Sequence, residues 1–369
     1  MEGDRRSALR RMVLGGRPAN AQRAACLPEG FVPPAGVCHR PFSSLVTNKE
    51  GAEAALAPCC VSWLKKDGVV RRYRRLDAEG IAAYWTSSLM DDMRASVLDG
   101  SYRYCDREQC PFLYSGNFRE AVYTTARGAY SRGFPLVLQY GLDSSCNLYC
   151  PSCRNERVTV DPLSGYGLDV EEVLSRGLRV LSANGSGEFF MDPGLLKMAR
   201  SFQASRHPGL TEFCLITNGQ LLTKRMWESL SEDFRGKVGS ISVSLDASTA
   251  PVYETVRRGG HFQIVMSNLE YLRGLVKSGE LCEFSLGFVL SASNFRDLPG
   301  FIDLAYRLGA CLVHVSPIQD WGSMSPTEYK AAAVHLTGHP EHGEYLAKLS
   351  EASSKRARYG LLSMGALSL

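Results

Sequence analysis

The sequence predicts an α/β fold, a partial (β/α)6 TIM-type barrel with a small N-terminal auxiliary domain. First, short apolar runs alternate with amphipathic stretches from Phe134 onward, which is typical of parallel strands joined by right-handed helical crossovers. Second, most of the cysteines fall into an N-terminal group and one tight loop, which indicates two separate cysteine sites. Third, 369 residues suffice for one large domain and one small one.

The elements of the barrel follow from their hydrophobic periods. The expected strands are Phe134–Tyr140, Glu212–Thr217, Ser240–Leu245, Glu283–Leu290 and Cys311–Ser316, with a short further strand just before Asn184. The expected helices are Val170–Ser182, Gly194–Ala204, Phe262–Lys277 and Phe295–Leu308. In such barrels chemistry lies in the loops after the carboxyl ends of the strands. The predicted organisation is a basic tail (1–30), the auxiliary domain (31–125), the barrel (126–325) and a C-terminal helical tail with a flexible end (326–369).

Composition restricts the class of protein. Hydrophobic residues make up 44% and charged residues 22% of the chain, as in ordinary soluble globular proteins. A net charge of +4 gives no reason to expect nucleic acid, and no run approaches the roughly 20 apolar residues of a membrane helix. The first 27 residues carry six arginines without an apolar core, so a secretory signal is not expected, and an organellar presequence is the alternative to a basic tail. We expect a cytoplasmic protein.

Cys146, Cys150 and Cys153 form the most informative motif, with C-x3-C-x2-C spacing and no fourth cysteine nearby. Three thiolates on one short loop fit a 4Fe–4S cluster and leave one iron without a protein ligand. A zinc site is the alternative, but zinc prefers four closed ligands and C-x2-C pairs.

This loop resembles the signature of the radical S-adenosylmethionine (SAM) superfamily. The resemblance implies that Cys146, Cys150 and Cys153 are catalytic, because they hold the cluster whose open iron is chelated by SAM. In that family the reduced cluster cleaves SAM to a 5′-deoxyadenosyl radical, which abstracts hydrogen from a bound small molecule or peptide. An electron donor such as flavodoxin or ferredoxin is implied as a partner, and neither nucleic acid nor membrane is.

The resemblance also implies cofactor-binding residues at the ends of successive strands. The segment Asn184–Glu188 looks like the family's glycine–glycine–glutamate segment that binds the SAM amino group, although Ser186 stands at one glycine position. A plain Asn-Gly turn at Asn218 and a surface arginine at Arg257 are the ordinary alternatives to SAM contacts. Alternation along a strand puts Ser244 and Asp246 on one side, toward the ribose. The complete implied set is Tyr149, Ser186, Gly187, Glu188, Asn218, Ser244, Asp246, Arg257, Val289 and Ser316.

The N-terminal third resembles the SPASM domain, the auxiliary-cluster module of many radical SAM enzymes. The resemblance implies a second 4Fe–4S cluster held by Cys38, Cys59 or Cys60, Cys105 and Cys110. Successive side chains on a strand face opposite ways, so only one of the adjacent cysteines is expected to be a ligand, and Cys59 is favoured. Unlike most SPASM modules, this one precedes the barrel and has thiols for one cluster. A four-cysteine structural zinc site is the alternative.

The reaction outcome stays open at this stage. An auxiliary cluster in similar proteins accepts an electron, binds substrate or donates sulfur, and we expect a role in specialised-metabolite biosynthesis. The alternatives are a peptide-modifying maturase and a radical epimerase, in which a barrel-facing thiol such as Cys311 would return hydrogen. Otherwise Cys214, Cys282 and Cys311 are expected to be buried, and His314 to be a barrel-interior residue. An alternative of another class is a non-catalytic iron–sulfur or zinc-binding sensor.

Overall fold

The computed structural model describes residues 27–34, 36–65, 68–110, 112–113, 116, 118, 130–159, 168–183 and 186–364. The basic tail up to residue 26, residues 184–185 of the glycine-rich segment, residues 119–129 at the expected boundary between auxiliary domain and barrel, and the last five residues lie outside these ranges. The described strands form one mixed sheet in the order β10-β9-β8-β7-β6-β5-β4-β1-β2-β3. No helix among the described residues is both long and apolar enough to cross a membrane.

The strands and helices have the following bounds. The strands are β1 (Ser44–Glu50), β2 (Glu53–Ala57), β3 (Arg71–Tyr73), β4 (Val137–Tyr140), β5 (Val180–Ala183), β6 (Glu212–Thr217), β7 (Val238–Ser244), β8 (Glu283–Leu290), β9 (Leu312–Pro317) and β10 (Leu362–Met364). The α-helices are α2 (Arg40–Ser43), α3 (Ala78–Trp85), α4 (Ser88–Leu98), α6 (Val170–Ser175), α7 (Pro193–Ser201), α8 (Lys224–Glu228), α9 (Glu232–Arg235), α10 (Ala250–Val256), α11 (Phe262–Ser278), α12 (Leu298–Leu308), α13 (Pro326–Ala332) and α14 (His342–Tyr359). Short 3-10 turns are η1 (Val61–Trp63), η5 (Phe189–Met191), η6 (Ala204–Arg206) and η7 (Phe295–Asp297).

Strands β4 to β9 pair in parallel in chain order, which confirms the predicted partial barrel. The sheet order is linear, so the barrel is open. The expected helix Val170–Ser182 is wrong beyond Ser175. There Gly177 takes a positive φ of 89°, the helix stops, and the chain enters β5, whose Val180 pairs with Val137 of β4.

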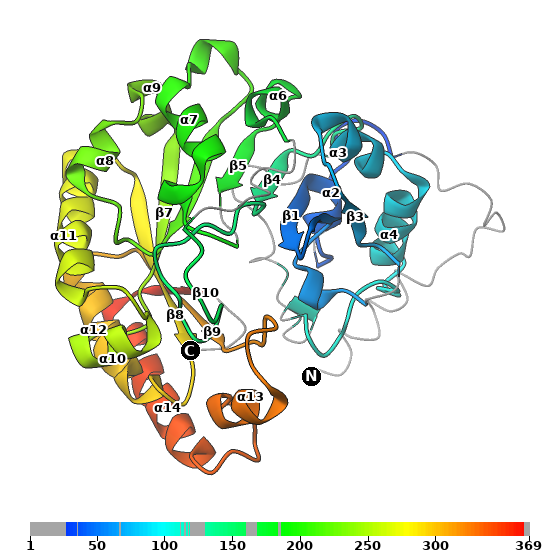
Figure 1. Cartoon of the computed structure of the whole chain (residues 1–369). Helices are drawn as coiled ribbons and strands as arrows, with labels where there is room; N and C mark the ends of the chain where they lie inside the picture. Colours follow the sequence, from blue (N-terminus) through cyan, green and yellow to red (C-terminus); the bar gives the residue numbers. More distant parts are fainter. Residues whose placement is uncertain are drawn as a thin grey trace.

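The two faces of the parallel sheet differ in chemistry. Buried residues of β8 point to the outer helices, and Phe288 packs on Phe301 of α12 with ring centroids 4.9 Å apart. The alternate residues of β7 and β8, which face the concave side, are mostly half-buried, and apart from Val289 most of them are small or polar. They include Ser240, Ser242 and Ser244 on β7 and Ser285 and Gly287 on β8. The barrel interior is therefore polar and partly accessible, with the helices on its outside (Figure 1).

The C-terminal segment continues the barrel. Helix α14 packs along α12, where Lys355 and Tyr359 both bind the carboxylate of Asp303 at 2.7 Å. The chain then returns to the sheet as β10, which pairs in parallel with β9. The sequence predicted only helix and a flexible end here. A strand of three residues is too short to have a detectable period.

The N-terminal module, defined as residues 31–113 where described, forms a lobe beside the barrel but shares its sheet (Figure 1). Strands β1 and β2 form an antiparallel hairpin, which turns at Gly51 with a φ of 60°. Strand β1 pairs in parallel with β4, so that Leu45 lies beside Leu138. The Lys49 amide donates a hydrogen bond to the Gly141 carbonyl (3.1 Å), which extends this contact toward the loop after β4.

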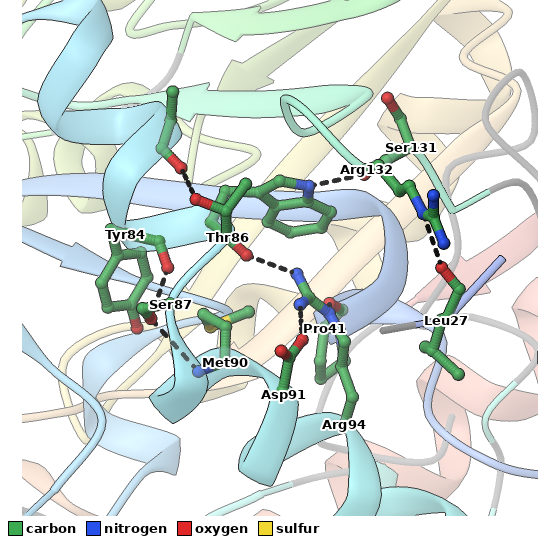
Figure 2. A network of polar contacts seen from close by, with 12 residues as sticks. Leu27, Pro41, Tyr84, Thr86, Ser87, Met90, Asp91, Arg94, Ser131 and Arg132 are labelled. Atoms are coloured by element: carbon green, nitrogen blue, oxygen red, sulfur yellow. Dashed lines mark hydrogen bonds and ion pairs between the residues drawn. The ribbon is translucent and has the colours of Figure 1, made fainter. Parts of the chain in front are cut away.

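Arg94 of α4 is the main internal support of the module (Figure 2). Its side chain is 1% exposed and donates to the carbonyls of Pro41 and Trp85, each at 3.0 Å, and to Asp91 at 2.9 Å. The guanidinium also lies 4.3 Å from the Trp85 ring centroid and 4.8 Å from that of Tyr130. Arg94 thus fixes the segment Cys38–Phe42 on helix α4.

We predict that Arg94→Leu lowers the free energy of unfolding by about 3 kcal/mol, because it leaves two buried carbonyls and a carboxylate without their donor. Urea denaturation followed by circular dichroism measures this loss. The control is Arg103→Leu, which removes an exposed ion pair with Asp92 and should cost at most about 1 kcal/mol. Equal losses for the two variants would contradict the role given to Arg94.

Candidate active site

The loop that carries Cys146, Cys150 and Cys153 follows β4 at the carboxyl end of the parallel sheet. Three backbone hydrogen bonds hold it: Cys146 N donates to the Val158 carbonyl (2.7 Å), Tyr149 N to the Arg258 carbonyl (3.1 Å) and Cys153 N to the Cys150 carbonyl (2.9 Å). The loop is therefore tied both to its own return segment and to the segment after α10.

Each of the three thiols contacts a side-chain donor from another position. Asn218 Nδ2 lies 3.7 Å from the sulfur of Cys146, Arg257 Nη1 lies 3.9 Å from that of Cys150, and Arg154 Nη2 lies 3.5 Å from that of Cys153. Asn218 follows β6, Arg257 follows α10, and Arg154 belongs to the loop itself. Donors directed at sulfur stabilise thiolate, the form that binds metal.

The pKa shifts of the loop thiols indicate a site that favours a bound group of positive charge. Burial raises the pKa of both Cys146 and Cys150. The Leu148 amide and Arg154 oppose the rise at Cys146, and Arg257 opposes it at Cys150. Two arginines recover only part of the cost of burying thiolates, and bound iron would supply the remaining positive charge. The residues present therefore fit a cluster held by three thiolates.

Gly187 lets the glycine-rich segment approach the cysteine loop. A Cβ at Gly187 would lie 2.6 Å from the carbonyl oxygens of both Asp143 and Ser145, so only glycine fits there. Beside it, Glu188 N donates to the Ser145 carbonyl at 2.7 Å. Arg154 reinforces the junction, because its guanidinium donates to the Ser186 carbonyl and to the Ser144 carbonyl.

The Glu188 carboxylate is 2% exposed and joins the ends of β5 and β6. It accepts hydrogen bonds from Thr217 Oγ1 (2.5 Å), Asn218 N (2.7 Å) and Phe190 N (3.3 Å). Burial raises the pKa of Glu188, while these three donors and Arg257 oppose the rise. Two carboxylate oxygens offer about four acceptor sites. One therefore stays available for a ligand's donor.

Asp246 and Arg257 form a buried ion pair of 2.6 Å, with side-chain exposures of 4% and 13%. The alternation argument does not apply to Asp246, because β7 ends at Ser244 and Asp246 has a left-handed φ of 62°. Val289 N donates to Asp246 Oδ1 at 2.7 Å and so ties the end of β8 to the pair. Burial raises the pKa of Asp246, and the Arg257 charge opposes this.

The other predicted cofactor residues lie around the same end of the sheet. Ser244 and Val289 are half-buried on the concave face, and Ser316 of β9 aligns with Val289 in the parallel register. Tyr149 instead packs on Gly259, with the Arg157 guanidinium 5.7 Å from its ring centroid. Tyr149 thus holds the loop against the segment after α10.

Sequence analysis missed an acidic cavity beneath the cysteine loop, lined by Tyr140, Asp143, Glu188 and Asp192 among others. Asp143 is 4% and Asp192 3% exposed. Asp192 caps α7 by accepting from Leu195 N at 2.9 Å. Burial, and secondarily the Asp143 charge, raise the pKa of Asp192 to about 6. No sequence signal marked these carboxylates, because their proximity depends on how the loop folds back.

The predicted N-terminal cysteines also meet. Cys38, Cys59, Cys105 and Cys110 line one cavity, together with Arg40, Trp63 and Phe112 among others. Cys60 is not among the lining residues, and its sulfur instead lies 3.1 Å from Ser62 Oγ. Across the described residues, no three His, Cys, Asp or Glu side chains are grouped as ligands of a single metal ion. A cubic cluster spaces its thiolates more widely than one zinc ion does.

Three isolated cysteines differ from expectation. Cys282 is exposed, and Cys214 and Cys311 are half-buried, so none is a fully buried apolar residue. Cys214 contacts Glu212 Oε1 at 3.2 Å, and Cys311 contacts the Phe284 carbonyl at 3.2 Å. His314, on β9, is exposed.

We predict that Gly187→Ala lowers the free energy of unfolding by about 2 kcal/mol and reduces iron bound on anaerobic reconstitution, because the two facing carbonyls are backbone atoms that cannot rotate away. Denaturation and iron analysis measure both effects. Gly209→Ala is the control, since open space surrounds its Cβ position. Normal iron loading in the Gly187 variant would show that the close approach is dispensable.

We predict a pH-dependent gain in stability for Asp192→Asn. The ordinary value for Asp is 3.8, so between about pH 4 and 6 the folded protein keeps a proton that the unfolded chain has lost. Wild-type stability therefore falls as pH rises through this window, and the full penalty applies above pH 6. The variant keeps a helix cap and should be about 1–3 kcal/mol more stable than wild type at pH 7 but not at pH 4.

Urea denaturation at these two pH values provides the test. Asp169→Asn changes the exposed cap of α6 and should show no such gain between pH 4 and pH 7. An Asp192 variant that is no more stable relative to wild type at pH 7 than at pH 4 would exclude the raised pKa.

Comparison with known proteins identifies relatives of the sequence. No family model matches the chain. Mycofactocin maturase MftC of Mycobacterium tuberculosis is 26% identical over 189 residues, which cover 50% of this chain and 45% of MftC. MftC of Mycobacterium ulcerans is 26% identical over 247 residues, covering 63% and 64% of the two chains. GTP 3',8-cyclase of Chlorobaculum tepidum is 24% identical over 192 residues, covering 50% and 54%. The chain thus spans about half the length of the curated relatives it matches.

Two solved structures resemble the chain over part of its length. Streptococcus suis SuiB bound to S-adenosylmethionine has a TM-score of 0.44 and 14% identity, covering 87% of this chain and 71% of SuiB. The anSMEcpe structure with bound AdoMet and a peptide has a TM-score of 0.46 and 18% identity, covering 63% of each chain. The sequence relatives confirm the resemblance to radical SAM enzymes that the cysteine loop predicts.

Proposed function

We propose that this protein reductively cleaves SAM and uses the resulting radical to abstract hydrogen from a bound substrate. When bound and reduced, a 4Fe–4S cluster with SAM supplies a 5′-deoxyadenosyl radical. The observation that carries the proposal is the set of three donors, Asn218, Arg257 and Arg154, each directed at a different loop thiol. Cysteines that lay together by chance would not be expected each to contact a different side-chain donor.

The cluster's ligands in this proposal are Cys146, Cys150 and Cys153. Hydrogen bonds to ligand sulfur and nearby positive charge raise the reduction potential of such a cluster. Arg154 and Arg257 supply the charge, and Asn218 supplies a neutral donor. They stabilise the added electron without occupying the iron that the three thiolates leave open.

SAM is placed by the loops that surround the cluster. Glu188, with its remaining acceptor site, and the Ser186 carbonyl receive the amino group, and Gly187 makes room for them. The Arg257 guanidinium binds the SAM carboxylate in this proposal. It does so either in addition to its ion pair with Asp246 or in place of that pair.

The nucleoside part of SAM lies along the carboxyl ends of β7 to β9. Ser244, Asp246, Val289 and Ser316 form this surface, and Asn218 adds a polar edge. Tyr149 completes the proposed cofactor-binding set, and its ring lies close to Gly259 after α10.

The N-terminal module is proposed to be a SPASM-like auxiliary domain with a second 4Fe–4S cluster. Its ligands are Cys38, Cys59, Cys105 and Cys110, which line one cavity. Four thiolates would complete the coordination of a cubic cluster, which favours a redox role over direct binding of substrate. We propose an auxiliary domain of residues 31–125 and a barrel core of residues 126–325, to whose sheet the C-terminal segment adds β10.

The proposed substrate is a peptide or a small molecule. The name of the maturases among the relatives favours a peptide, and that of the cyclase favours a nucleotide-sized molecule. The small polar residues on the concave face, such as Ser242 and Ser285, suit hydrogen bonding to either. We place the reaction in the cytoplasm, with flavodoxin or ferredoxin as electron donor, because free thiols and clusters require a reducing compartment.

We predict that the anaerobically reconstituted protein, given dithionite and SAM, forms 5′-deoxyadenosine, and that Cys150→Ala lowers the rate by at least about a hundredfold by removing a cluster ligand. Liquid chromatography of the nucleoside measures the rate. Cys282→Ala is the matched control, because this thiol is exposed and isolated, and it should retain wild-type activity.

The same experiment separates the enzyme from a non-catalytic iron–sulfur sensor. A sensor would bind iron but would not cleave SAM. Absence of 5′-deoxyadenosine from protein that contains a full complement of iron would sink the proposal, and so would undiminished cleavage by the Cys150 variant.

A further inference from the structure

The cavity of the N-terminal module contains one cationic side chain, Arg40, among its lining residues. Arg40 lies two residues after Cys38 and begins α2. Its guanidinium carbon is 5.4 Å from the Trp63 ring centroid and 5.3 Å from that of Phe112. These two rings meet edge to face, with centroids 5.5 Å apart. Cation–π contacts therefore fix the guanidinium in an aromatic corner at the cavity wall.

Arg40 has donor capacity that the protein does not use. Its Nε is buried, and no hydrogen-bond partner for it lies in the described part of the chain. A buried, unpaired guanidinium N–H is costly, and native proteins rarely leave one without a ligand or water. An acceptor bound in the cavity that Arg40 lines would satisfy this donor.

Arg40 lines the same cavity as Cys38, Cys59, Cys105 and Cys110. Its positive charge therefore favours anionic sulfur at these thiols.

We propose that Arg40 is a positioning and tuning residue of the auxiliary cluster, whose sulfur atoms accept its free N–H and whose reduction potential it raises. This inference rests on the auxiliary cluster proposed above. Reduction adds one negative charge to a cluster, so a fixed neighbouring cation stabilises the reduced form more than the oxidised form. The aromatic walls exclude water and strengthen the effect, because charges interact more strongly at low dielectric.

Such an effect suits a cluster that takes up an electron. A cluster ligated by four thiolates carries more negative charge than one with three, which by itself lowers its potential. Arg40 offsets that charge. Trp63 and Phe112 hold the side chain in one place, so the offset does not depend on a flexible surface cation.

The test is an anaerobic redox titration of the full-length reconstituted protein, with the auxiliary cluster followed by electron paramagnetic resonance. Arg40→Gln should lower its midpoint potential, so that the ratio of reduced to oxidised cluster at a fixed potential falls about tenfold, equivalent to about 59 mV for a one-electron couple. Arg40→Lys keeps the charge and should recover most of the shift. Arg72→Gln is the control, because Arg72 pairs with Glu50 on β1 and does not line the cavity.

The outcomes distinguish this inference from the proposed function. A wild-type protein that binds only about four iron atoms, rather than about eight, would overturn the auxiliary site and the inference together. Full iron with an unchanged potential in Arg40→Gln would overturn the inference alone. A shift that Arg40→Lys fails to restore would also overturn it, because it would assign the effect to packing rather than to charge. The inference is supported by a lower midpoint potential in Arg40→Gln, by its recovery in Arg40→Lys and by an unchanged potential in Arg72→Gln.

Discussion

The buried carboxylate of Glu188 is the interaction on which the geometry of the site depends. Its two oxygens accept from the hydroxyl and amide donors of Thr217 and Asn218, while its own amide donates to the Ser145 carbonyl of the cysteine loop. Three loops from the ends of β4, β5 and β6 therefore share one residue. Asn218, placed by this bond, in turn reaches Cys146. A buried acid is costly unless it is hydrogen-bonded, and the bonds that offset this cost for Glu188 also set the positions of the loops.

A second constraint is charge balance around buried sulfur. Both cysteine sites contain buried thiols, Cys150 in the loop and Cys59, Cys105 and Cys110 in the module. The ionised form of a buried thiol is unfavourable without a compensating cation. At the barrel loop, Arg154 of the loop itself and Arg257 after α10 supply this charge, and in the N-terminal module Arg40 is held by two aromatic rings. Each arginine alone is insufficient, and the remaining deficit is what a metal cluster would satisfy. The same reasoning accounts for Asp246, whose burial is tolerable because Arg257 lies 2.6 Å away.

Sequence reasoning succeeded where a local pattern carries the information. The bounds of β6 and β8 were predicted to the residue, because apolar and polar residues alternate and polar turns flank them. The end of α6 and the strand β10 were not predicted, since each depends on pairing with a distant strand over three or four residues. The contacts of Asp143, Asp192 and Arg154 were also missed. They arise only when the cysteine loop folds onto Gly187, and the one local trace of that event is the glycine itself.

The pairing of β1 with β4 has a consequence for the spacing of the two cysteine sites. Leu45 of the module and Leu138 of the barrel are neighbours in one hydrogen-bonded sheet, so the module is not suspended from a hinge. The spacing between the two proposed clusters is set by the stiffness of that sheet. A transfer of electrons across a swinging joint would slow in a viscous solvent. Electron transfer between two clusters held by one sheet would keep its rate in glycerol, because the distance between them does not depend on motion through the solvent.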